Sequence, residues 1–154
     1  MRRATVFLTD DHSLLLDAFS NLLEPKYDVV GTASDGRQML SKVGKLKPDV
    51  VVLDISMPKL NGFDAGEKLK KLHPEIKLIF LTQNEDPDMV TEAFRIGANG
   101  YLLKNSAAEE LFQAIDVVVG GGSYVPPVIT QGMISSFIKK PGSEKIHGSL
   151  TIRQ

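Results

Sequence analysis

The sequence predicts a doubly wound α/β fold, in which five flanking helices cover both faces of a five-stranded parallel sheet. Five short apolar runs, rich in β-branched and aromatic residues, alternate along the chain with longer amphipathic stretches. Most of these runs do not alternate between apolar and polar residues, which is typical of parallel strands buried on both faces. At 154 residues, of which 42% are hydrophobic, the chain is long enough to build one such domain.

The predicted strands are the apolar runs at residues 6–8, 29–30, 50–53, 78–81 and 101–103. Pro48 and Pro74 stand shortly before the third and fourth runs. Because proline lacks a backbone N–H, each of them is expected to stop the helix that precedes it.

The five predicted helices are the amphipathic stretches at about 13–24, 36–46, 61–72, 87–96 and 107–119. In the first of them Leu15 and Phe19 fall on one apolar stripe, and in the last Leu111 and Ile115 do the same. The glycine-rich segment 120–123 is expected to end the last helix.

The chain beyond this segment predicts a smaller unit. Two prolines open a short apolar helix at about 127–138, and a stretch without clear periodicity follows it. We therefore expect a first domain at 1–124, a linker with a short helix at 125–149, and the first residues of a further domain at 150–154.

Composition excludes several classes of site. The chain has no cysteine, which excludes disulfides, thiolate metal sites and a cysteine nucleophile. No apolar run reaches the roughly 18 residues that a membrane span needs, and the first run leads directly into acidic residues, which is atypical of a signal peptide. With a formal net charge of −1, the sequence predicts a cytoplasmic protein with no membrane partner.

Chemically reactive side chains follow four of the five predicted strands. Asp10 and Asp11 follow the first, Asp54 the third, Thr82 the fourth and Lys104 the fifth. Because parallel strands point the same way, these residues are expected to meet at one edge of the sheet, where open α/β sheets bind their ligands.

Three close carboxylates repel one another, so they must take up protons or bind a cation. Oxygen ligands favour Mg²⁺ over zinc. With Lys104 and Thr82 on the other side of a phosphoryl group, the set suits phosphoryl transfer, and Asp54 is the natural nucleophile at a central strand end.

Simpler roles remain open for single residues. Asp10 or Asp11 could cap the first helix, and His12 is more typical of a first helical turn than of a metal ligand, because no second histidine lies near it. His73 and His147 are expected at the surface. A metal-dependent phosphohydrolase with an aspartate nucleophile is the alternative enzyme hypothesis, but Ser56 stands where its second acid would be needed.

Taken together, the strand-end residues and their neighbours resemble the receiver domain of bacterial two-component response regulators. The segments that carry the resemblance are Asp10-Asp11-His12, Asp54-Ile55-Ser56-Met57-Pro58, Asn61-Gly62, Leu81-Thr82, Ala98-Asn99-Gly100-Tyr101 and Leu103-Lys104. Segments 120–124 and 150–153 resemble the NarL/LuxR-type subfamily, whose members carry a C-terminal helix-turn-helix DNA-binding domain.

The resemblance implies a flavodoxin-like sheet with strand order 2-1-3-4-5 and a role for each matching residue. Asp54 matches the phosphoacceptor, and Asp10 and Asp11 match the acidic pair, of which Asp11 is the expected direct Mg²⁺ ligand. The metal ligands further include Asp54 and the backbone carbonyl of Ser56. Thr82 and Lys104 match the residues that sense the phosphoryl group.

Three further positions bear on how the site switches. Tyr101 matches the aromatic switch residue of the family, although a simple core aromatic would also fit there. Gln83 stands where the family usually has a small residue and is expected to slow access to the site, and Asn105 replaces a common proline. Gln83 alone favours a third hypothesis, a receiver-like interaction module that works without phosphorylation.

The resemblance thus implies a phosphoacceptor, not an enzyme with a separate substrate, that takes part in its own phosphorylation and dephosphorylation. Its implied partners are a cognate histidine kinase and a second copy on activation, and its implied output is transcription regulation. DNA binding is expected only through the domain that would begin at 150–154, so these 154 residues alone are expected to show no sequence-specific DNA binding.

Overall fold

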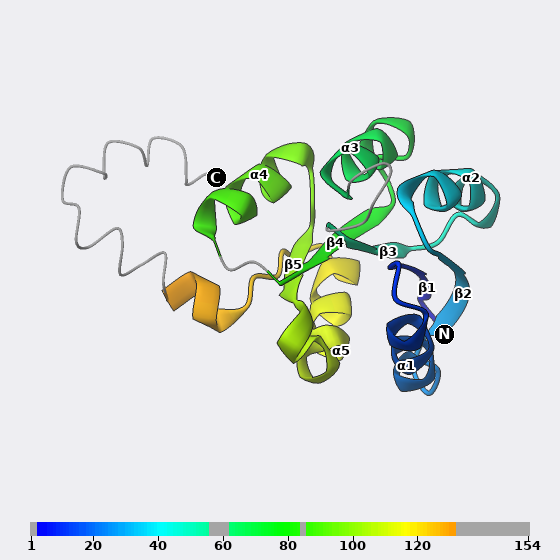
Figure 1. Cartoon of the computed structure of the whole chain (residues 1–154), viewed down its shortest axis with the longest axis horizontal. Helices are drawn as coiled ribbons and strands as arrows, with labels where there is room; N and C mark the ends of the chain where they lie inside the picture. Colours follow the sequence, from blue (N-terminus) through cyan, green and yellow to red (C-terminus); the bar gives the residue numbers. More distant parts are fainter. Residues whose placement is uncertain (1–2, 56–61, 84–85, 132–154) are drawn as a thin grey trace.

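A computed structural model describes residues 3–55, 62–83 and 86–131 of the chain. It contains a five-stranded parallel sheet with the order β2-β1-β3-β4-β5 (Figure 1). The strands are β1 Thr5–Thr9, β2 Asp28–Ala33, β3 Val50–Asp54, β4 Lys77–Thr82 and β5 Gly100–Leu103. The predicted fold class and strand order are both confirmed.

Helices cover both faces of the sheet, with α2, α3 and α4 on one side and α1 and α5 on the other (Figure 1). They are α1 Ser13–Leu23, α2 Gly36–Leu46, α3 Gly62–Leu72, α4 Pro87–Ile96 and α5 Ala107–Val119, with a short 3-10 turn η1 at Lys104–Ser106. Each observed helix ends within one residue of its predicted limits among the described residues. No helix in the described part of the chain is long and apolar enough to cross a membrane.

The burial of β3 explains why its sequence does not alternate. Val51 and Leu53 belong to the core beneath α2, α3 and α4, whereas Val50 and Val52 belong to the core beneath α1 and α5. All five residues of β3 are buried, including Asp54 at its end. A strand covered on both faces needs apolar side chains at every position except where it leaves the sheet.

Local sequence signals set the helix ends. Asp35 caps α2 by accepting a hydrogen bond from the backbone N–H of Gln38. Pro87 occupies the first turn of α4, and Gly97 ends that helix in the left-handed conformation, with φ of 118°. The connections to the sheet are therefore short, which fixes where each strand end lies relative to the next.

The chain beyond α5 returns to the edge of the sheet. Tyr124 forms a parallel bridge with Gly100, in which its carbonyl accepts from the N–H of Tyr101 at 3.0 Å. The phenol of Tyr124 donates to Glu110 of α5. Residues 127–131 are helical and bury Ile129, as the sequence predicts for the start of the linker helix; its predicted remainder lies outside the described residues.

Candidate functional site

The carboxyl ends of the strands bring the predicted site residues to one edge of the sheet. Asp10 follows β1, Asp54 ends β3 and Thr82 ends β4, and all three side chains are buried. Lys104 follows β5, and its side chain is 10% exposed. Ser56, the expected carbonyl ligand, lies outside the described residues.

Lys104 neutralises two of the carboxylates. Its ammonium donates to Asp54 Oδ2 at 2.9 Å and lies 3.4 Å from Asp10 Oδ2. Burial lowers the pKa of Lys104, but the hydrogen bond and charge of Asp54, together with the charge of Asp10, raise it above its usual value overall. The lysine therefore stays charged where it faces the two acids.

An incomplete charge balance remains on the acid side of the site. Asp10, Asp11, His12 and Asp54 each offer one ligand atom, and these atoms all lie within 4.8 Å of one another. Asp10 Oδ2 is buried, and apart from the Lys104 ammonium at 3.4 Å it has no polar partner among the described residues, so one lysine faces three carboxylates. A buried carboxylate oxygen in that state favours a divalent cation, so the residues present fit the Mg²⁺ that receiver domains typically bind.

His12 is also part of this cluster. The sequence predicted the acids of the cluster but not the histidine. It stands at the N-cap of α1, so neither Asp10 nor Asp11 has the capping position. Its backbone N–H donates to Asp10 Oδ1 at 2.9 Å, and its ring Nδ1 lies 2.9 Å from the same oxygen and 3.2 Å from Asp11 Oδ1. The only sequence signal was its position directly after the acidic pair.

The return from β3 to α3 passes very close to the site. The N–H of Gly62 donates to the carbonyl of Ile55 at 3.1 Å. A Cβ at Gly62 would lie 2.4 Å from Ile55 Cα and 2.5 Å from the carbonyl oxygen of Asp54. Only glycine fits there without displacing the backbone that carries Asp54, which explains Gly62 in the resembling segment.

Tyr101 is completely buried and connects the site to α4 and β5. Burial raises the pKa of its phenol to about 12, while a hydrogen bond with the side chain of Thr82 acts in the opposite direction. Tyr101 is therefore a core aromatic that contacts a strand-end hydroxyl, and its role as a switch residue stays a prediction.

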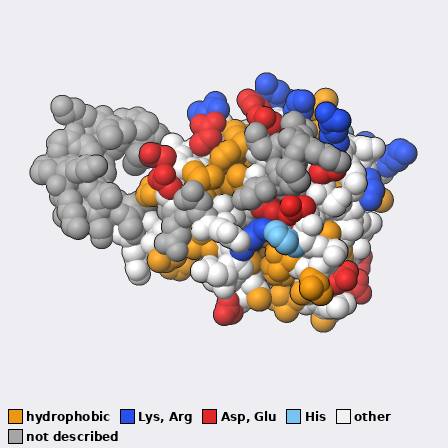
Figure 2. Space-filling model, in the orientation of Figure 1, with side chains coloured by type: hydrophobic (Ala, Val, Ile, Leu, Met, Phe, Trp, Pro, Cys, Tyr) orange, Lys and Arg blue, Asp and Glu red, His pale blue; other side chains and the backbone are white. Residues whose placement is uncertain are grey.

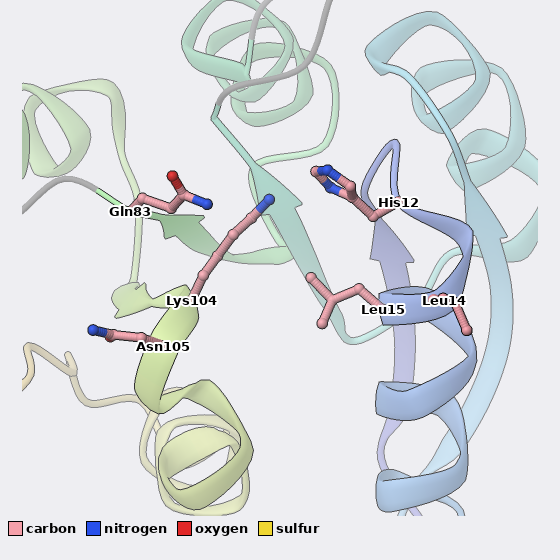
Figure 3. A pocket seen from close by; sticks show the side chains of 6 residues that line it. All are labelled: His12, Leu14, Leu15, Gln83, Lys104 and Asn105. Carbon is pink, nitrogen blue, oxygen red and sulfur yellow. The ribbon is translucent and has the colours of Figure 1, made fainter.

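A hollow of about 590 Å³ opens beside the site. It is lined by His12, Leu14, Leu15, Gln83, Lys104 and Asn105 (Figure 3). Gln83 is exposed and its amide lies across the hollow from the ring of His12 (Figure 3). On this face acidic side chains gather beside a histidine and a basic side chain, with apolar side chains next to them (Figure 2).

Comparison with known proteins gives the same picture. The family model described as "Response regulator receiver domain" matches residues 6–116. The transcriptional regulatory protein DegU of Brevibacillus brevis is 37% identical over 134 residues, which are 86% of this chain and 57% of DegU. The chain therefore spans little more than half the length of this curated relative.

Solved structures of other response regulators resemble the whole described fold. A LuxR-family two-component response regulator from Aurantimonas sp. SI85-9A1 matches with a TM-score of 0.84 at 28% identity, over 89% of this chain and 99% of that one. The isolated REC domain of RcsB from Salmonella enterica serovar Typhimurium, with the phosphomimetic BeF3−, matches with a TM-score of 0.78 at 25% identity, over 84% and 98%.

A second RcsB structure holds two RcsB dimers bound to two parallel DNAs, and it matches at 26% identity with a TM-score of 0.77, over 84% of this chain and 67% of that one. The family match spans the acids after β1, the acid that ends β3 and the lysine after β5. The chain is thus homologous to two-component response regulators and belongs to the family of response regulator receiver domains.

Proposed function

We propose that this receiver domain accepts a phosphoryl group on Asp54 from the phosphohistidine of a sensor histidine kinase. The observation that carries the proposal is the buried Asp54 carboxylate with the Lys104 ammonium 2.9 Å from one of its oxygens. A carboxylate and a cation held together at a strand end are placed to meet a phosphoryl group and to balance its charge.

The proposed transfer makes one bond and breaks one. An oxygen of Asp54 attacks the phosphorus, and the P–N bond to the donor imidazole breaks with its electron pair passing to the nitrogen. The ammonium of Lys104 balances the negative charge on the phosphoryl oxygens during the transfer. The hydroxyl of Thr82, at the same edge of the sheet, is the second side-chain group that faces the phosphoryl group. The domain acts on itself in this reaction, so we propose a phosphoacceptor and not an enzyme with a separate substrate.

We assign Mg²⁺ binding to Asp10, Asp11, Asp54 and the backbone carbonyl of Ser56, with Asp11 as a direct ligand. The support is the cluster of ligand atoms within 4.8 Å and the buried Asp10 Oδ2, whose one polar neighbour among the described residues is the Lys104 ammonium at 3.4 Å. When bound, the ion supplies positive charge to a phosphoryl group. Asp10 and Asp11 would hold the ion beside Asp54.

The output of the switch is proposed to run through Tyr101. The phenol of Tyr101 forms a hydrogen bond with the side chain of Thr82 in the core. Movement of Thr82 toward a phosphoryl group would therefore alter the packing of Tyr101 against α4. We propose that this change promotes a homodimer and controls a DNA-binding domain that begins at 150–154, after the receiver at 1–124 and the linker at 125–149.

The relatives support this output: DegU is a transcriptional regulatory protein, and RcsB dimers have been solved on DNA. A cognate histidine kinase, the cytoplasmic location that the composition predicts, and transcription regulation are parts of the same proposal.

The direct test is labelling with a small acyl-phosphate donor, with and without Mg²⁺, followed by peptide mass mapping. We expect an adduct on Asp54 that depends on Mg²⁺ and is absent from Asp54→Asn. Asp17→Asn, an exposed aspartate of α1, is the control and should label normally. An adduct on another residue, or undiminished labelling of Asp54→Asn, would refute the assignment.

A further inference from the structure

His12 has no role in the proposed phosphoryl transfer, yet it is bound to both acids after β1. Its ring is on the open side of the cluster, with 63% of the side chain exposed, whereas Asp10 beneath it is 2% exposed. The ring also borders the hollow opposite Gln83 (Figure 3). A solvent-facing imidazole that contacts two carboxylates of a cation site is placed to coordinate the cation itself.

We propose that Nδ1 of His12 is an additional metal ligand, which gives this site affinity for transition-metal ions such as Ni²⁺ beyond what the carboxylates provide. The inference rests on the proposed function, because it uses the same acidic cluster. The proposal makes His12 a determinant of metal selectivity and keeps Asp54 as the phosphoryl acceptor.

The distances around Nδ1 suit a shared ion. In a six-coordinate site with bonds of about 2.1 Å, adjacent ligand atoms lie about 3.0 Å apart. Nδ1 lies 2.9 Å from Asp10 Oδ1 and 3.2 Å from Asp11 Oδ1. In the metal-free protein the same separations let the ring stabilise the two carboxylates by hydrogen bonding.

The backbone holds the histidine in this position. Its φ of −100° and ψ of 104° are extended, and its N–H donates to Asp10 Oδ1 at 2.9 Å. The carbonyl of His12 accepts from the N–H groups of Leu15 and Leu16, each at 3.1 Å, which start α1. The donor atom is therefore already oriented before a metal binds, and little conformational freedom is lost on binding.

The chemistry separates two ions of nearly equal size. Mg²⁺ prefers oxygen ligands and keeps several waters, so it gains little from an imidazole nitrogen. Ni²⁺ binds imidazole strongly and stands well above Mg²⁺ in its affinity for nitrogen. Loss of the ring should consequently weaken Ni²⁺ binding and leave Mg²⁺ binding unchanged.

Calorimetric titration of the full chain with Ni²⁺ and with Mg²⁺, at one fixed pH, tests the proposal. All proteins should carry His147→Gln, which removes the histidine outside the described residues as a competing ligand. His12→Gln retains a polar amide beside the acids, and His73→Gln is the matched control, because His73 lies after α3 beside Glu75. Asp11→Asn should weaken the binding of both ions.

We expect His12→Gln to lower the affinity for Ni²⁺ at least about tenfold and to leave the affinity for Mg²⁺ unchanged. A tenfold loss is common even when the residue removed only hydrogen-bonds a metal ligand. Pulsed electron paramagnetic resonance of the Cu²⁺-loaded protein should show modulation from an imidazole nitrogen, which His12→Gln loses and His73→Gln keeps.

Equal Ni²⁺ affinity in the His147→Gln parent and in its His12→Gln variant, with Mg²⁺ binding intact, would overturn the role of His12 and leave the proposed function standing. Failure of both ions to bind the His147→Gln parent would instead refute the metal site itself, and with it the Mg²⁺ assignment of the proposed function.

Discussion

The ammonium of Lys104 lies 2.9 Å from Asp54 Oδ2, although the two residues are 50 positions apart in the sequence. Both side chains are at the ends of their strands, and β4 separates β3 from β5 in the sheet. The contact crosses that strand because a lysine is long enough to reach along the sheet edge. This ion pair joins the central strand of the fold to the strand that carries Tyr101.

Lys104→Met should destabilise the metal-free protein. The change leaves the buried Asp54 and Asp10 carboxylates without their cation, which costs about 3 kcal/mol for a buried pair. Urea unfolding measures the difference. In an Asp54→Asn background the same substitution should cost clearly less, and an equal loss in both backgrounds would show that the two charges are not coupled.

Mg²⁺ should stabilise the wild-type protein more than Asp11→Asn. A ligand that binds only the folded state at a hundredfold excess over its Kd adds about 2.7 kcal/mol to the free energy of unfolding. Thermal unfolding with increasing Mg²⁺ measures this as a rise in Tm. Asp17→Asn should respond like wild type, and a full rise in Asp11→Asn would exclude Asp11 as a direct ligand.

Gln83→Ala should speed phosphorylation, loss of the phosphoryl group, or both. The side chain follows Thr82 and lines the hollow beside Lys104, where we expect its amide to obstruct the approach of a donor or of water. Time courses of labelling by an acyl phosphate, and of decay after its removal, measure the two rates. Gln113→Ala, an exposed glutamine of α5, is the control; if neither rate changes, Gln83 does not limit access.

The ion pair between Asp116 of α5 and Lys26 of the α1–β2 connection should stabilise the protein at neutral pH and lose this effect in acid. Burial raises the pKa of Asp116, but hydrogen bonds from Lys26 and Tyr27 lower it below its usual value overall. This stabilisation is complete above the unfolded-state pKa of about 3.9 and is lost as the pH falls through the lower folded-state pKa.

The difference in unfolding free energy between wild type and Asp116→Asn should therefore shrink as the medium is acidified. We expect less than about 1 kcal/mol at neutral pH, because the Asp116 side chain is half exposed. Denaturant unfolding across the acidic range measures the difference. A gap that stays constant with pH would show that Asp116 titrates alike in the folded and unfolded chains.

Tyr124→Ala should expose the amide of Tyr101 to exchange with solvent. The N–H of Tyr101 donates to the carbonyl of Tyr124, whose own side chain is 7% exposed and bonded to Glu110. Loss of that anchor should speed exchange of the Tyr101 amide by about tenfold, equivalent to one hydrogen bond of 1.4 kcal/mol.

Hydrogen exchange followed by NMR measures the effect, with the amide of Phe80 in β4, an interior strand of the sheet, as the internal reference. Tyr124→Phe, which keeps the ring and loses the phenol, should give a smaller change. Unchanged protection of Tyr101 in Tyr124→Ala would show that other groups hold this edge of the sheet.

Fold class, the order of elements and the meeting of acids at one sheet edge followed from local sequence features. Burial on both faces leaves an apolar run such as Val50 to Leu53 in β3, and parallel strands necessarily place the residues after them together. Asp10, Asp54, Thr82 and Lys104 could thus be grouped by their positions after strands, without knowledge of any side-chain contact.

Three features depended on tertiary structure. The ring of His12 turns onto Asp10 and Asp11 because α1 starts at that point and in that direction, and residue order alone does not give a rotamer. Gly62 is required because α3 returns against the backbone of Asp54.

Tyr124 provides the third feature, since it pairs with β5 only because α5 brings the chain back beside that strand. Periodicity and spacing report which residues share an element or an edge, since both are set by the local backbone. Which atoms of distant elements touch is set by packing, and so only the folded chain could decide it.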